Sequence, residues 1–178
     1  MIIGLIGPKL SGKGTIAQYL QERRGAVVYS MSGVIVDITN RLYLPKTRAN
    51  IIAAATAMRG AFGEDVFAQV LKKDIEGAQP ALAVIDGIRM PKEVEIFSQL
   101  PEFTLIYVDA PLRLRYERAL GRGEKAGENN MTFQEFQVEE SAVTEQNISS
   151  LKEKAVAVIE NSQSLEYLYS QIRQIINV

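Results

Sequence analysis

A short glycine-rich segment near the start of the chain restricts the fold more than any other feature of the sequence. It reads G-P-K-L-S-G-K-G-T over residues 7–15 and follows the apolar run at residues 2–6. A continuous apolar run of this kind is typical of a strand buried on both faces. The residues after the segment have helical spacing, so the pattern G-x-x-x-x-G-K falls between a buried strand and a helix. This context predicts an α/β fold whose first loop binds phosphate.

The residue types of this segment suit a phosphate site. Glycines let backbone N–H groups close around phosphate oxygens, and the following helix directs its positive end at the same anion. Lys13 is expected to neutralise the β- and γ-phosphate oxygens of a nucleotide. Gly14 stands where the common pattern has Ser or Thr, so the hydroxyl expected near Mg²⁺ comes one residue later, at Thr15. The residues predicted to bind the nucleotide are Gly7, Ser11, Gly12, Lys13, Gly14 and Thr15.

Short apolar runs alternate with helical patterns along the rest of the chain. The further strands are expected at residues 26–29, 81–85, 103–108 and 155–159. Helices are expected at residues 15–23, 31–42, 47–61, 64–76, 91–100, 111–120, 132–140 and from Ser164 onward, and residues 121–130 read as a mobile loop. This alternation predicts a parallel sheet covered by helices on both faces, with ligands at the carboxyl ends of the strands.

Composition excludes several kinds of chemistry. The chain has no cysteine and no histidine, which rules out disulfides, thiolate metal sites, a cysteine nucleophile and a histidine base. A formal net charge of −1 gives no general attraction to nucleic acid. The apolar start lacks a basic region and breaks at Gly7, so neither a signal peptide nor a membrane span is expected. We expect a cytoplasmic protein that acts on a small molecule.

Asp86 follows a predicted buried strand and is expected beside the glycine segment. A carboxylate at that position can hold Mg²⁺ through water molecules, since this cation keeps several waters in such sites. The plainer interpretation is a turn aspartate that supports Gly87.

Three arginines share one face of the helix predicted at residues 111–120 and its exit. Arg115, Arg118 and Arg122 are spaced i, i+3 and i+7, so they repel one another unless anions or carboxylates lie opposite. One interpretation is a lid that closes on the triphosphate, with Arg118 and Arg122 on the transferring phosphoryl group. The other is a solvated basic face.

The chain resembles the adenylate-kinase-related and dephospho-CoA-kinase-like small P-loop kinases over nearly its full length. The segments that carry the resemblance are residues 7–15, Y-S-M-S at 29–32, P-K-T-R-A-N at 45–50, V-I-D-G-I-R at 84–89, V-D-A-P-L-R-L-R-Y-E-R at 108–118 and T-F-Q-E-F at 132–136. The resemblance implies one three-layer P-loop domain over residues 1–178, with a five-stranded, mostly parallel sheet. It also implies an acceptor-binding insertion at about residues 31–76 and an arginine lid at about residues 113–140.

The resemblance further assigns acceptor residues. Arg89, in Asp-Gly-x-Arg, resembles the arginine that grips acceptor and donor phosphates, and Arg48 resembles the arginine that holds the acceptor phosphate. Arg59 is a weaker second to Arg48, and Ser32 offers a hydroxyl on the acceptor side. The sequence departs from the family at Gly33, near which many relatives carry an aspartate; Asp37 replaces it only if its helix is oriented unusually.

These features predict phosphotransfer from Mg-ATP to a nucleoside monophosphate or a similar small nucleotide-like acceptor. A phosphate acceptor is favoured because its oxygen is already a nucleophile and needs no general base. A hydroxyl acceptor would benefit more from a carboxylate that acts as a base. The alternatives are a dephospho-CoA-type kinase acting on a hydroxyl, a regulatory nucleotide-binding protein with little transferase activity, and a nucleic-acid-stimulated ATPase. ATP and Mg²⁺ are implied by the resemblance, with adenine expected near Arg122 and residues 161–164.

Overall fold

A five-stranded parallel sheet forms the centre of the protein. The computed structural model describes residues 1–122, 131–140, 148 and 150–176, without the side chain of Arg122. The strands are β1 (Ile2–Ile6), β2 (Val27–Ser30), β3 (Ala83–Asp86), β4 (Phe103–Asp109) and β5 (Ala157–Glu160). Their order is β2-β3-β1-β4-β5, and every neighbouring pair is parallel. The predicted three-layer α/β class is confirmed, and all five residues of the central strand β1 are buried.

The predicted helices are present, with ends that shift by a few residues. They are α1 (Lys13–Arg24), α2 (Met31–Arg41), α3 (Arg48–Phe62), α4 (Val66–Ala78), α5 (Pro91–Phe97), α6 (Leu112–Arg122), α7 (Phe133–Glu140) and α9 (Leu165–Ile175). A 3-10 helix, η2 (Leu151–Lys154), was not expected because so short a segment leaves no periodic pattern. The loop predicted at residues 121–130 lies outside the described residues from residue 123 onward.

Local signals explain where two of the helices begin and end. Gly25 ends α1 with a φ of 65°, and its N–H donates to the carbonyl of Gln21. At the start of α9 the Ser164 hydroxyl accepts from the N–H of Tyr167 at 3.2 Å, as a capping serine should.

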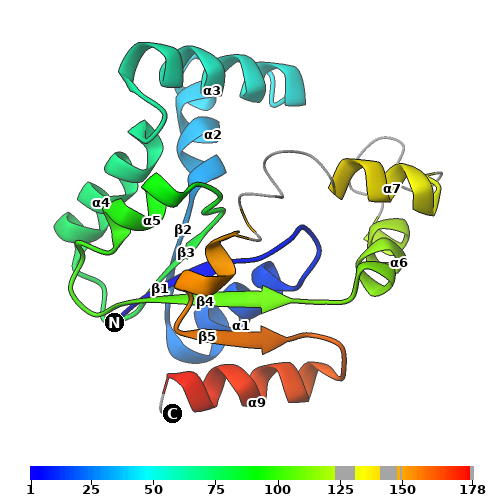
Figure 1. Ribbon diagram of the computed structural model, residues 1–178. Coiled ribbons are helices and arrows are strands. Elements are labelled where there is room, and N and C mark those ends of the chain that lie inside the picture. The colour runs from blue at the N-terminus through cyan, green and yellow to red at the C-terminus, as the bar shows by residue number, and fades with distance from the viewer. Residues whose placement is uncertain (123–130, 141–147, 149, 177–178) are drawn as a thin grey trace.

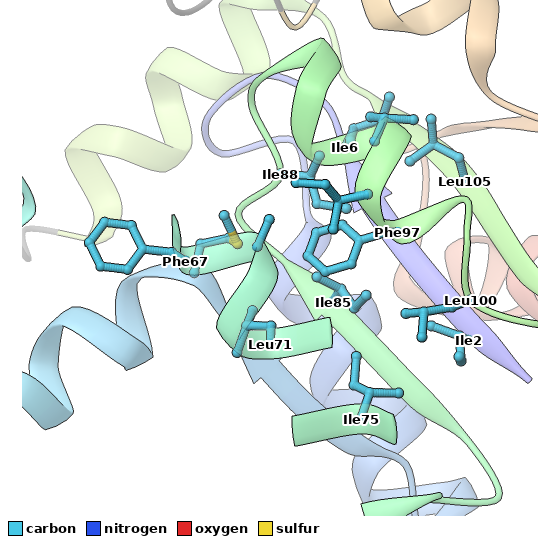
Figure 2. Packing of buried hydrophobic residues seen from close by; sticks show 14 of the residues in the cluster. Ile2, Ile6, Phe67, Leu71, Ile75, Ile85, Ile88, Phe97, Leu100 and Leu105 are labelled. Carbon is cyan, nitrogen blue, oxygen red and sulfur yellow. The ribbon is translucent and has the colours of Figure 1, made fainter. Parts of the chain in front are cut away.

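Helices cover both faces of the sheet (Figure 1). On one face α1 and α9 pack through residues such as Leu20 and Leu168. On the other face α2, α4 and α5 enclose a second core cluster, in which Leu71 and Ile75 of α4 lie on the side of the sheet and the Phe67 ring points away from it (Figure 2). Because both faces are covered, a ligand reaches the strands at their ends.

The carboxyl ends of the strands meet along one edge. Leu5 in β1 and Ser30 in β2 are both opposite Asp86 in β3, and Asp109 in β4 is opposite Glu160 in β5. Helices α6 and α7 lie beyond this edge, past the arrowheads of β4 and β5 in Figure 1. The glycine-rich loop between β1 and α1 (residues 7–12, the glycine loop) therefore has Asp86 on one side and α6 on the other.

Helix α3 stands apart from the sheet. Ala55 is its buried residue, and Figure 1 shows the helix lying across the far end of α2. Exposed Tyr43 and Leu42 precede it in the turn from α2. Within the segment expected to bind the acceptor, α3 thus lies apart from the sheet, whereas α2 and α4 contribute to the core.

Candidate phosphate-transfer site

Side-chain donors fix the orientation of the glycine loop. Lys13 Nζ donates to the carbonyls of Gly7 and Pro8, at 2.8 Å each. The next three carbonyls accept from Arg115 (Lys9 O, 3.2 Å), Arg118 (Leu10 O, 3.1 Å) and Asn161 (Ser11 O, 2.8 Å). In a trans peptide the N–H points opposite to the C=O. The N–H groups of Leu10 and Gly12 consequently point away from the donors on α6 and Asn161, which suits anion binding.

The glycines of the motif do not have equal steric roles. Gly7 has a φ of 140°, and a Cβ there would lie 2.0 Å from the carbonyl oxygen of Val108. Gly12 has a φ of 107°, and a Cβ would lie 2.1 Å from Asn161 Nδ2. A Cβ on Gly14 would meet nothing within 4 Å among the described atoms. The first two positions therefore require glycine, whereas Gly14 has room for a side chain.

A cavity of about 740 Å³ opens on the loop, and we call it the loop cavity. The residues that line it are Lys9, Leu10, Gly12, Lys13, Gly14, Thr15, Gln18, Asp86, Arg89, Arg118, Asn161 and Leu165. Four of these are cationic (Lys9, Lys13, Arg89 and Arg118), and Asp86 is the one acid among these lining residues. The cavity is thus suited to a polyanion with room for one bound cation.

Asp86 provides the test of whether the site fits Mg²⁺. Its Oδ1 is buried and has no hydrogen-bond partner in the described part of the chain, and the same holds for the hydroxyl of Ser11. Buried polar atoms are normally paired, so an unpaired carboxylate oxygen at this cavity is suited to binding a cation. Thr15 adds a second hydroxyl to the cavity wall. Oxygen donors of this kind suit Mg²⁺, with phosphate and water completing its coordination.

Arg89 reaches the cavity from a loop that Glu93 holds. Glu93 Oε2 accepts from the backbone N–H of Arg89 at 2.8 Å and of Met90 at 3.1 Å. The carboxyl group is buried, and burial raises its pKa above the ordinary value despite those hydrogen bonds and the positive charges of Arg59 and Arg89. Sequence reasoning missed Glu93, although Pro91 followed two residues later by Glu is a known start signal for a helix.

The arginines of α6 contact the glycine loop directly. Arg118 donates to Leu10 O and to Asn161 O, each at 3.1 Å, and burial lowers its pKa without removing its charge. Arg115 is buried and forms an ion pair with Glu140 of α7. The expected repulsion on this face is therefore relieved by a carboxylate, and neither arginine belongs to a solvated basic surface. The Arg122 side chain lies outside the described residues.

The predicted acceptor residues other than Arg89 do not line the loop cavity. Arg48 is exposed at the first position of α3, and Ser32 Oγ is 3.0 Å from Ser30 Oγ. Arg59 lies 3.9 Å from Glu64 and stacks on Phe67, which gives it a structural role.

Asp37 and Asn161 are two further residues that the sequence analysis considered near the site. Asp37 is exposed on α2 and is not among the residues that line the cavity. Asn161, expected near adenine, is buried and its amide is committed to Ser11 O. Sequence reasoning missed this support, and it also missed Lys9, which lines the cavity.

The fold and this site together define a P-loop kinase-like protein that binds a nucleotide. A family model described as an AAA domain matches residues 6–137. A UPF0200 protein from Methanoculleus marisnigri is 30% identical over 176 residues, which cover 98% of this chain and 94% of that relative. The chain therefore belongs to the UPF0200 family.

Solved structures share the fold at low sequence identity. The structure of TT1252 from Thermus thermophilus matches with a TM-score of 0.68 and 20% identity, covering 99% of this chain and 96% of that one. A shikimate kinase from Bacteroides thetaiotaomicron matches with a TM-score of 0.66 and 10% identity, covering 100% of this chain and 99% of that one. In the described segments no helix has both the length and the apolar character needed to span a membrane.

Proposed function

We propose that this protein transfers the γ-phosphate of ATP to a nucleoside monophosphate or a similar small nucleotide-like acceptor. The observation that carries the proposal is the loop cavity, in which Lys13, Arg89 and Arg118 face a single carboxylate beside a preorganised glycine loop. Phosphoryl transfer depends on positioning and charge neutralisation more than on covalent chemistry by the protein. This set of side chains supplies both.

The donor is bound by the loop and by the start of α1. The N–H groups of Leu10 and Gly12 and the ammonium group of Lys13 neutralise its phosphate oxygens. Asp86 and the Thr15 hydroxyl, which both line the cavity, would hold Mg²⁺, and this ion would neutralise charge on the phosphates. Arg118 adds a guanidinium group from the α6 side of the same cavity.

The charge of the cavity favours a phosphate acceptor over a hydroxyl acceptor. Asp86 is the one carboxylate among the lining residues, and we assign it to the metal, which leaves no second acid in that set to act as a base. A phosphate oxygen is already a nucleophile and needs orientation only. In this proposal Arg89, which lines the cavity, orients that oxygen, and Arg48 reaches the acceptor only if the α2–α3 segment moves toward the sheet.

The test is ADP release with Mg-ATP and one candidate acceptor at a time. The panel contains AMP, dAMP, CMP, dCMP, UMP, dTMP, GMP and dephospho-CoA. We expect one nucleoside monophosphate to raise turnover far above the ATP-only rate. Lys13→Ala and Arg118→Ala should each lower that rate by about a hundredfold. Arg113→Ala is the matched control, since Arg113 lies on the same helix as Arg118 but is 67% exposed and pairs with Glu117.

Three results contradict the proposal in different ways. Stimulation by dephospho-CoA alone identifies a hydroxyl acceptor. ATP binding with no response to any acceptor favours a regulatory nucleotide-binding protein. Equal turnover in the wild type and in Lys13→Ala shows that the reaction does not take place in the loop cavity.

A further inference from the structure

Lys9 lies between two places where its ammonium group could bind an anion, the loop cavity and the carboxylates of α7. It belongs to the glycine loop and lines the loop cavity, but its Nζ lies 2.5 Å from Glu139 Oε2 on α7. The same ammonium group is 3.6 Å from Glu140 Oε1 and 4.5 Å from the centre of the Phe136 ring. The ammonium group of a residue that lines the loop cavity is thus paired with carboxylates on α7.

The two glutamates on α7 differ in how firmly they are held. The Glu140 side chain is only 12% exposed, pairs with buried Arg115, and leaves its Oε1 without a hydrogen-bond partner in the described part of the chain. Glu139 is 52% exposed and has Lys9 as its ion-pair partner. A half-exposed pair of this kind is weak because water and salt screen it. The Arg115–Glu140 pair therefore docks α7, whereas the Lys9–Glu139 pair can exchange.

We propose that Lys9 is a second phosphate-binding lysine of the donor site, and that Glu139 competes with the donor for it. The inference rests on the proposed nucleotide site. A polyphosphate chain carries several negative charges and several acceptor oxygens, whereas Glu139 offers one charge at a solvated position. The long flexible stem of lysine lets its ammonium group swing from α7 to the cavity without movement of the loop backbone.

This exchange makes α7 sensitive to the nucleotide. When Lys9 binds phosphate, α7 loses the Lys9–Glu139 contact with the glycine loop but stays docked through the Arg115–Glu140 pair. The competition also lowers the nucleotide affinity, because the Lys9–Glu139 pair must break before Lys9 can bind phosphate.

ATP binding to the full-length protein tests the role of Lys9 without any acceptor. Lys9→Met should weaken ATP binding by about tenfold, since one charge-assisted contact is lost. Lys9→Arg should retain most of the affinity because it keeps the charge. Circular dichroism and thermal unfolding of each variant show that the fold is intact before the comparison is made.

A double-mutant cycle tests the competition. Glu139→Gln should strengthen ATP binding by about threefold in the wild-type background and should have no effect in the Lys9→Met background. Glu117→Gln is the matched control: Glu117 is 55% exposed and pairs with Arg113 on α6, away from the loop, so ATP binding should not change.

The outcomes separate this inference from the proposed function. If Lys13→Ala abolishes ATP binding but Lys9→Met leaves it unchanged, Lys9 is not a phosphate ligand and the donor site stands. If Glu139→Gln weakens ATP binding, or changes it equally in the wild-type and Lys9→Met backgrounds, Glu139 does not compete with ATP for Lys9. If the wild type binds no ATP, the donor site and the role of Lys9 fail together.

Discussion

Gly12 and Gly14 of the phosphate-binding motif differ in what an added methyl group would meet, and the difference gives the sharpest prediction at the residue scale. A Cβ on Gly12 would lie 2.1 Å from Asn161 Nδ2, whereas a Cβ on Gly14 has open space. We expect Gly12→Ala to lower the free energy of unfolding by about 3 kcal/mol through steric overlap and a strained φ, and to abolish ATP binding. Gly14→Ala should raise that free energy by about 0.5 kcal/mol because Gly14 lies in a helix.

Urea unfolding and ATP titration of the two variants measure these effects. The steric account is contradicted if both substitutions have the same effect. A Gly14→Ala protein that folds but binds no ATP instead shows that the ligand itself approaches Gly14 closely.

Glu93 provides a pH-dependent prediction at the same scale. Burial raises the pKa of its carboxyl group, so the folded chain binds this proton more tightly than the unfolded chain. The group therefore destabilises the folded state increasingly as the pH rises through the interval between the two pKa values. In Glu93→Gln the amide oxygen can still accept from the N–H groups of Arg89 and Met90, and no charge is buried. We expect the variant to gain stability relative to the wild type as the pH rises from about 4 to 8.

This prediction is tested by measuring the unfolding free energies of the wild type and Glu93→Gln across that pH range. A stability difference that does not change with pH contradicts the raised pKa.

At the scale of elements, a largely buried ion pair joins α6 to α7, beside the aromatic contacts of Tyr116 with Phe133 and Phe136. Arg115 and Glu140 have side chains 8% and 12% exposed, and Arg115 also donates to Ala110 O and Lys9 O. We expect Arg115→Met to lower the free energy of unfolding by about 3 kcal/mol, because Glu140 is left as a buried charge without that partner. Amide hydrogen exchange should also become faster in α7.

Glu117→Gln is the control for this effect. It removes the largely exposed Arg113–Glu117 pair but leaves Arg113 over the rings of Tyr116 and Phe133, so it should change stability by no more than about 0.5 kcal/mol. Equal losses in the two variants show that the α6–α7 contact does not rest on Arg115.

Patterns that are local in sequence predicted most of the elements. The bounds of β1 were predicted as observed because its five apolar residues are all buried and the motif follows directly. Helix α5 ends earlier than expected, at Phe97, where the Ser98 hydroxyl donates to the carbonyl of Val94. Periodicity alone does not show that kind of local contact.

The supports of the site were missed because they join distant parts of the chain. Lys9 and Glu139 are 130 residues apart, and Asn161 and Ser11 are 150 residues apart. No spacing rule connects such residues, so the motif predicted which loop binds phosphate but not what holds that loop. The domain limits, with an insertion at residues 31–76 and a lid at residues 113–140, stay predictions.

At the scale of the whole molecule, ligand binding at the strand ends should stabilise the entire domain. A ligand that binds the folded state alone adds about 2.7 kcal/mol at a concentration one hundred times its Kd. For a chain of 178 residues this corresponds to a rise in Tm of about 5–10 °C. We expect Mg-ATP to produce that rise in the wild type, as measured by calorimetry, and to produce none in Lys13→Ala. A rise of the same size in both proteins places the binding site elsewhere.

The pairing of the glycine-loop carbonyls has a consequence for how the protein is made. The loop comes early in the chain, but three of its carbonyls find their donors on Arg115, Arg118 and Asn161. A nascent chain that has emerged only as far as β4 already contains the whole phosphate-binding motif, yet none of those three donors. Competence to bind nucleotide should therefore arise late in synthesis and abruptly, when β5 joins the sheet and brings Asn161 to Ser11.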